Sequence, residues 1–113
     1  MKINSNILSI VIAGLALLFP ILSHAGGEVR HGLVTGVSTW SEHVDIGTDA
    51  PFIDPDACGG GGGYYRIDLT TPGANARLAS ILLAYSLRKT VGLSLEGCVG
   101  TAPAIDGVRG FGP

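Results

Sequence analysis

The stretch YYRIDLTTPGANARLASILLAYSLRKTVGLSLEGC, residues 64–98, decides the fold. Its first part, Tyr64 to Leu69, is rich in aromatic and β-branched residues, which favour strands. Its last part, Thr90 to Glu96, alternates apolar residues with small or polar ones and predicts another strand. The residues from 71 to 89 between them predict a helix, so the segment is a strand, a helix and a strand.

The predicted helix has recognisable ends and one apolar face. Thr71 is the expected cap, and Pro72 suits the first helical position. Arg88 and Lys89 are expected in the last turn, where cations complement the helix dipole. Four residues at the spacing of a single helix face predict the side that is buried: Leu78, Ile81, Leu82 and Tyr85.

Two more strands are predicted before this segment. Residues 28–40 predict one long first strand, in which Gly32 and Gly36 interrupt the alternation and indicate a bulge or bend. His43 to Thr48 alternates strictly and predicts a short half-buried strand. Residues 49–63, with two prolines and five successive glycines, predict a loop.

A fifth strand is predicted from Ile105 to Phe111, so the element order is three strands, a helix and two strands. The fold class is therefore β-rich α+β. This is the order of the five-stranded OB-like barrel. A small antiparallel sheet with one helix on one face has the same order, and the sequence leaves both open.

The first 25 residues have the three parts of a secretory signal peptide. Lys2 precedes an apolar run from Ile7 to Leu22, and Ser23-His24-Ala25 places small residues where a signal peptidase reads them. The run is short and contains Pro20, which favours a cleaved leader over an uncleaved membrane anchor. We expect a signal peptide over residues 1–25.

Residues 26–113 are then expected to form a single small domain in the periplasm or outside the cell. Without Lys2, six Lys and Arg stand against nine Asp and Glu, a formal charge of −3. The cations are scattered, whereas nucleic-acid binding and contact with anionic lipid rest on clustered cations. Nucleic acid and a membrane surface are therefore disfavoured as partners.

Cys58 and Cys98 are the only two cysteines, and an oxidising compartment favours their pairing. The bridge closes a loop that the loop-entropy model values at about 4 kcal/mol. Two free thiols or half of a metal site are the alternatives. A zinc site has no support, because no close pair of cysteines exists.

Two features of the loop have a functional and an ordinary interpretation. Gly59 to Gly63 is more simply a flexible or tightly turning segment than a phosphate loop, because no Lys-Ser/Thr follows and a strand comes next. Asp49, Asp54 and Asp56 are expected to form a solvated acidic loop, with calcium binding as the alternative. Their spacing does not match an EF-hand.

His31 and His43 are the two histidines of the exported part, and His43 shares a strand face with Asp45. An imidazole beside a carboxylate is a candidate metal ligand or general base. A surface or cross-strand histidine is the ordinary role, and no nucleophile motif is present. The sequence therefore predicts a non-enzymatic protein with no cofactor and no metal.

Aromatic residues are the candidate ligand contacts, because aromatic faces stack on sugar rings. We select Trp40, Tyr64 and Tyr65, with Phe52 beside them in sequence. Successive strand residues point to opposite faces, so one tyrosine of the pair is expected in the core and the other at the surface. For Trp40 and Tyr85, core packing is the ordinary expectation.

Several motifs carry a family resemblance: Pro55 to Cys58, the Ala/Leu-rich stretch Ala79 to Tyr85, and Val91 to Cys98. With them the chain resembles a group of small exported bacterial proteins of uncharacterised function. More remotely, Val91-Gly92-Leu93-Ser94 and Phe111-Gly112-Pro113 are similar to segments of the binding subunits of subtilase-type AB5 toxins. That resemblance implies an OB-fold. It transfers no glycan-contacting residue, because the toxins' aromatic-rich middle is absent.

These observations predict an exported binding module for a glycan or a partner protein. The alternative is a periplasmic inhibitor or immunity-type protein that docks on another protein, for which small size and an acidic surface are suitable. The oligomeric state is open: the toxin resemblance implies a ring of subunits, and an inhibitor is expected to be a monomer. We favour a monomer or small oligomer.

Overall fold

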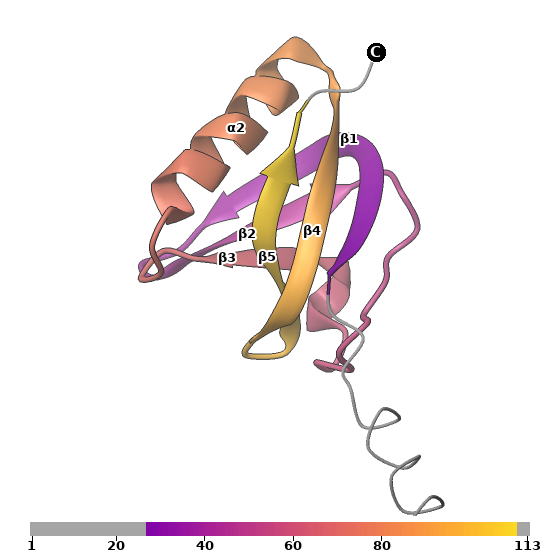
Figure 1. The fold of residues 1–113 in the computed structure, drawn as a ribbon, viewed down its shortest axis with the longest axis vertical. Helices are drawn as coiled ribbons and strands as arrows, with labels where there is room; N and C mark the ends of the chain where they lie inside the picture. The colour runs from indigo at the N-terminus through magenta and orange to yellow at the C-terminus, as the bar shows by residue number, and fades with distance from the viewer. Residues whose placement is uncertain (1–26, 111–113) are drawn as a thin grey trace, which may run out of the picture.

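The computed structural model describes residues 27–110, and Figure 1 shows how their elements are arranged. The predicted signal peptide, residues 1–25, lies outside the described residues, as does Phe111 at the end of the predicted fifth strand. The elements follow in the order β1 (Glu28–Thr39), β2 (His43–Thr48), the short 3-10 turn η2 (Gly61–Gly63), β3 (Tyr65–Asp68), α2 (Ala74–Leu87), β4 (Thr90–Val99) and β5 (Ala102–Arg109).

The strands form one sheet that closes into a ring in the order β1-β2-β3-β5-β4 and back to β1. The first half of β1, up to Leu33, pairs with β4, and the second half, from Val34, pairs with β2. A register shift between Val34 and Gly36 marks the change, which confirms the bent first strand. The parallel pairing of β3 with β5, through Arg66 and Ala104, completes the ring.

One apolar core fills the ring. Alternate residues of the strands point inward, as the period of two requires, and α2 adds residues from one face. Gly32 is required by a close approach: a Cβ there would lie 3.0 Å from the Ala50 Cβ and the Asp49 Oδ1. The buried core residues are Val34, Val44, Ile46, Tyr65, Ile67, Ala74, Ile81, Ala84, Val91, Leu93, Leu95 and Ile105.

The ends of α2 differ from the prediction. The helix begins at Ala74, after Gly73 with φ 77°, and no side chain caps it. Thr71 donates its hydroxyl to the Asp68 carbonyl instead, so it closes the turn before the helix. Arg88 and Lys89 were expected in the last turn, but they follow the last helical residue, Leu87.

The buried face of α2 is also different from the predicted one, which was Leu78, Ile81, Leu82 and Tyr85. Ile81 is fully buried and Leu78 packs against the core, but Leu82 and Tyr85 are 41% and 44% exposed. Ala84 is buried in their place. Small alanine side chains at 74 and 84 let the helix approach the sheet, and Ile81 packs into the core between them.

The remaining boundaries shift by a few residues. β4 continues to Val99, so Cys98 lies inside the strand, and β5 begins at Ala102 after a short turn. The loop predicted over residues 49–63 contains no strand. Among the described residues, no helix is long and apolar enough to cross a membrane.

Candidate functional site

The outer surface of β2 and β3 carries a row of polar side chains. Because alternate residues of β2 fill the core, His43 and Asp45 point outward. The same alternation on β3 turns Arg66 and Asp68 outward. The register sets Arg66 beside Asp45 and Asp68 beside His43, so the four residues form one polar strip.

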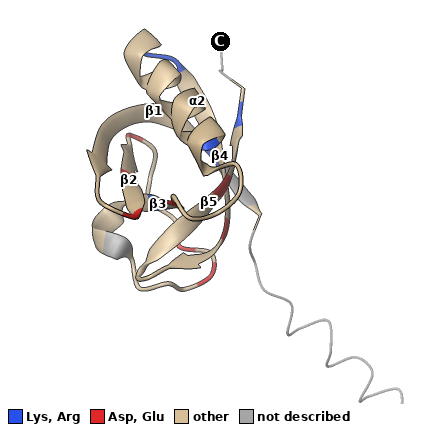
Figure 2. Cartoon of the chain, turned by 90° about the vertical axis from the view of Figure 1, so that its left-hand side faces the viewer, with Lys and Arg blue, Asp and Glu red and all other residues tan. Residues whose placement is uncertain are grey.

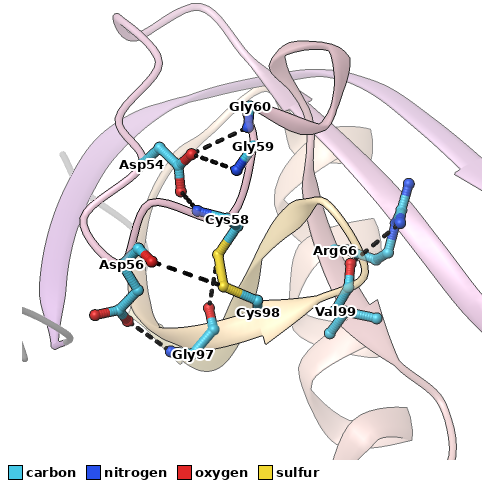
Figure 3. The surroundings of a disulfide bond; sticks show 9 residues. All are labelled: Asp54, Asp56, Cys58, Gly59, Gly60, Arg66, Gly97, Cys98 and Val99. Atoms are coloured by element: carbon cyan, nitrogen blue, oxygen red, sulfur yellow. Dashed lines mark hydrogen bonds between the residues drawn. A yellow bond between two sulfur atoms is a disulfide. The ribbon is translucent and has the colours of Figure 1, made fainter.

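Asp45 is the centre of this strip. Its carboxylate accepts hydrogen bonds from the Arg66 Nε at 2.6 Å and the Nη2 at 3.5 Å, and the His43 Nε2 lies 3.9 Å away. The Arg66 Nη1 also donates to the Val99 carbonyl at 3.1 Å, as Figure 3 shows. The guanidinium is thus held in place by groups from β2 and β4, which makes the strip rigid.

Two exposed aromatic rings flank the strip. Trp40, in the turn between β1 and β2, is 59% exposed and stacks on the His43 ring with centroids 6.1 Å apart. Tyr64, just before β3, is 43% exposed, and its ring lies over Gly47. A Cβ at Gly47 would come within 3.4 Å of that ring, so the absence of a side chain at Gly47 lets the ring pack on the backbone of β2. Both rings therefore lie on the outer face of β2.

The structure separates the three predicted ligand contacts. Tyr64 and Tyr65 point to opposite sides, as predicted. Tyr65 is 1% exposed, stacks on Phe52 with centroids 5.0 Å apart, and accepts a hydrogen bond from the Ile53 N–H. Its candidate role as a ligand contact is therefore corrected: Tyr65 is a core residue and offers no ring to the surface.

The expectation of core packing is wrong for two other aromatic residues. Trp40 falls just past the end of β1, where the chain turns, so the alternation of the strand no longer directs its ring inward. Tyr85 lies in the last turn of α2, one turn after the buried Ile81, and it is 44% exposed where it lines the hollow between α2 and β1. The alternation of a strand does not predict the direction of a side chain in a turn.

The two histidines lie apart. His31 is on β1, and its Nε2 lies 3.1 Å from where a Cβ at Gly92 would be, beside the Arg109 Cβ. His43 is on β2 and shares its face with Asp45, as predicted, but that carboxylate is already bonded to Arg66. Across residues 27–110, no group of three or more His, Cys, Asp or Glu is placed to hold a metal ion.

Asp54 organises the glycine-rich loop. Its carboxylate accepts hydrogen bonds from the N–H groups of Cys58, Gly59 and Gly60 at 2.8, 3.0 and 3.0 Å (Figure 3). These hydrogen bonds, the one from Cys58 above all, lower the pKa of Asp54 below its usual 3.8. Asp54 therefore serves as the loop's internal acceptor, a role that the sequence pattern did not predict.

The other two acidic residues of the loop fasten it to the sheet. Asp49 accepts a hydrogen bond from the Leu33 N–H of β1 at 2.8 Å. Asp56 accepts one from the Gly97 N–H of β4 at 2.7 Å. The carboxylates at 49, 54 and 56 are therefore each directed at separate backbone amides and do not converge on one point.

The predicted disulfide is confirmed. Cys58 and Cys98 are bonded, with their Cα atoms 5.5 Å apart, and the bridge spans 40 positions (Figure 3). It joins the loop to β4 next to the contact between Asp56 and Gly97. The covalent bond and the carboxylates hold the same segment, so the loop is a fixed part of the surface.

Two hollows lie elsewhere on the surface. One, of about 440 Å³, lies between β1 and the end of α2 and is lined by Leu33, Val34, Thr35, Ala84, Tyr85, Ser86 and Arg88. The other, of about 310 Å³, lies between the start of α2 and the β4–β5 hairpin, with Asp68, Arg77, Glu96 and Asp106 in its lining. Neither includes Trp40 or Tyr64, so the aromatic face is an open surface.

Comparison of the chain with models of protein families, with characterised proteins and with solved structures finds no significant match. Function must therefore be argued from the surface itself.

Proposed function

We propose that this protein is an exported binding module of OB-like architecture that recognises a saccharide through the outer face of β2 and β3. The strand order β1-β2-β3-β5-β4 and a helix between β3 and β4 support the OB-like assignment. In that fold the face of strands 2 and 3, with the 1–2 and 4–5 loops, is a common binding surface. Trp40 lies in the 1–2 loop of this chain.

The observation that carries the proposal is the pair of exposed rings on one polar face. Trp40 and Tyr64 present large apolar surfaces to water, and such surfaces favour contact with a ligand. The apolar faces of a sugar ring stack on aromatic side chains. The Asp45–Arg66 pair between the two rings supplies donors and acceptors for hydroxyl groups, in a geometry that is already fixed.

The experiment is a glycan array with the protein purified after export, followed by titration of any bound saccharide. Trp40→Ala and Tyr64→Ala should each weaken binding by about tenfold or more, which corresponds to the loss of about 1.4 kcal/mol. Tyr85→Ala is the matched control, because Tyr85 is exposed to a similar extent but lies on α2.

Two outcomes would contradict the proposal. One is that no saccharide binds above background while a stoichiometric protein partner is captured from envelope extract, the result expected of an inhibitor. The other is that Tyr85→Ala weakens saccharide binding as much as Tyr64→Ala, which would move the site to α2.

Export supports this role, because saccharide-bearing surfaces lie outside the cytoplasm. The predicted leader and the Cys58–Cys98 bridge both favour a periplasmic or secreted protein. Cell fractionation, with N-terminal sequencing of the exported form, tests the location. Recovery of the protein in the cytoplasm with residues 1–25 attached would contradict it.

A further inference from the structure

The larger of the two hollows, between β1 and the end of α2, has the composition of a small-molecule site. It opens where β1 passes from β4 to β2, and Thr35 is paired with neither strand at that point. Its volume of about 440 Å³ falls within the range of ligand pockets, which combine apolar walls with a few polar groups. Here Leu33 and Tyr85 are exposed apolar walls, and Thr35, Ser86 and Arg88 supply the polar groups.

The hollow carries a positive charge that the protein itself does not neutralise. Arg88 is the only charged residue among the described residues of its lining, and Figure 2 shows the blue segment just past the upper end of α2. Within residues 27–110 the Arg88 guanidinium forms no hydrogen bond and no ion pair. Asp49 accepts a hydrogen bond from the Leu33 N–H at 2.8 Å, but it is not part of the lining.

The backbone at Arg88 has a conformation that normally belongs to glycine. Its φ is 53° and its ψ is 46°, and only Ala57 shares a positive φ among the described residues other than glycine. The Arg88 N–H donates to the Tyr85 carbonyl at 3.4 Å, and the Lys89 N–H donates to the Ala84 carbonyl at 3.0 Å. These two bonds make a Schellman turn, in which glycine is the usual residue because it has no Cβ. An arginine in this position, with its side chain in a hollow, indicates a role for that side chain.

We propose that this hollow binds a small carboxylate with an apolar body, and that the Arg88 guanidinium holds the carboxylate. A guanidinium presents two parallel N–H groups, which match the two oxygens of a carboxylate. The apolar body lies against Leu33 and the Tyr85 ring, which are 36% and 44% exposed without it. The Thr35 hydroxyl is a further donor at the wall of β1.

The lining favours an acyl or aryl body over a saccharide. The Ser86 hydroxyl already donates to the Leu82 carbonyl at 2.9 Å, so its proton is not available to a ligand. A ring with many hydroxyl groups needs more donors and acceptors than Thr35 and Arg88 provide. The proposal does not rest on the saccharide site, because neither Trp40 nor Tyr64 lines this hollow.

The test uses octanoate as the probe and the protein purified after export. Isothermal titration calorimetry should give one site with a dissociation constant of about 1 mM or below, as expected for a ligand of about ten non-hydrogen atoms. Octanol has the same chain without the charge and should bind at least about tenfold more weakly. The amide chemical shifts of Thr35 and Ser86 should move with octanoate, and that of Asp45 in the polar strip should not.

Arg88→Gly separates a contact with the ligand from a role in the fold. It should weaken octanoate binding by about tenfold or more. Its thermal midpoint should stay the same or rise, because glycine adopts the left-handed conformation without strain. Arg88→Lys keeps the charge but not the planar fork, so its affinity should lie between those of the parent and Arg88→Gly.

Lys89→Gln is the matched control, because it removes one positive charge beside Arg88 but outside the lining. It should change octanoate binding by less than about twofold, since solvent and salt screen an exposed charge.

Several results would overturn the proposal. One is the absence of saturable octanoate binding up to about 10 mM, and another is equal affinity for octanoate and octanol. Equal losses in Arg88→Gly and Lys89→Gln would show that the probe responds only to net charge. A lower thermal midpoint of Arg88→Gly would show that the arginine serves the fold, and shifts confined to Leu82 and Leu83 would place the probe outside the hollow.

Discussion

At the scale of single residues, the carboxylate of Asp54 fixes the conformation of the run of five glycines, Gly59 to Gly63, at its start. Glycines lose more conformational freedom on folding than other residues do, so a run of five strongly favours the unfolded chain. Gly59 and Gly60 have φ of 120° and 87°, which only glycine adopts readily. Asp54 offsets this cost in part by accepting three backbone hydrogen bonds from the start of the run.

Asp54 makes stability depend on pH in acid. Its pKa is lowered in the folded protein, so its contribution is fully present above the unfolded value of 3.8 and is lost as the pH falls through the lower folded value. Asp54→Asn should therefore reduce the urea midpoint at neutral pH and flatten its decline below pH 3.8. Asp106→Asn, at an exposed position on β5, is the control and should leave the decline unchanged. An unaltered decline in Asp54→Asn would contradict this account.

Among the elements, α2 shows how packing chooses a face. The helix is apolar on nearly every side, so several faces are compatible with burial by composition alone. Ala74 and Ala84 leave room for close approach, and Ile81 fills the space between them. Leu82, Leu83 and Leu87 are therefore left at the surface.

This choice predicts unequal costs for two similar truncations. Ile81→Ala should destabilise the fold by about 2–5 kcal/mol, because it opens a cavity under the helix. Leu83→Ala should cost less than about 1 kcal/mol in dilute protein, because the side chain is half exposed. Urea unfolding of both variants, with their midpoints and slopes compared, is the measurement. Equal losses would mean that α2 is rotated relative to this description.

The disulfide attaches the loop of residues 49–63 to β4 and is expected to stabilise the fold. The Cys58→Ser, Cys98→Ser double variant should lose about 2–5 kcal/mol of unfolding free energy, mainly because its unfolded chain is less restricted. Thermal and urea unfolding measure the loss, and mass spectrometry before and after reduction verifies the bridge in the parent. Alkylation of both thiols in the native, non-reduced protein would contradict it.

For the whole molecule, the decisive event is closure of the ring between β3 and β5. That parallel pairing is short and runs through Arg66 and Ala104. The Arg66 side chain reinforces it by bonding Asp45 on β2 and the Val99 carbonyl near the start of β5. One cation thus connects three strands.

Removal of this cation should therefore weaken closure. Arg66→Met should destabilise the protein by about 2–4 kcal/mol, because it leaves Asp45, which is 8% exposed, without its partner. Asp45→Asn in the same chain should recover part of that loss, and a double-mutant cycle measures the coupling. Arg109→Met, at the exposed end of β5, should change stability by less than about 0.5 kcal/mol. An additive cycle would show that the pair is not coupled.

The sequence by itself determined the features that depend on residues close together in the chain. The period-two pattern over His43 to Thr48 predicted β2 with its observed bounds, and the glycines of residues 28–40 predicted the bend of β1. Alternation also placed Tyr64 and Tyr65 on opposite faces. The paired cysteines followed from their number and the expected compartment. Each of these inferences needs only local geometry or composition.

The tertiary structure alone decided what depends on residues that are distant in sequence. Asp45 and Arg66 are 21 positions apart, and no local pattern predicts that they meet between two exposed rings. The exposure of Trp40 depends on where β1 ends, and the inward face of α2 depends on how closely the sheet lets it approach. Side-chain periodicity fixes the faces of an element relative to each other. Which face is buried is set by the shape of the surface it packs against.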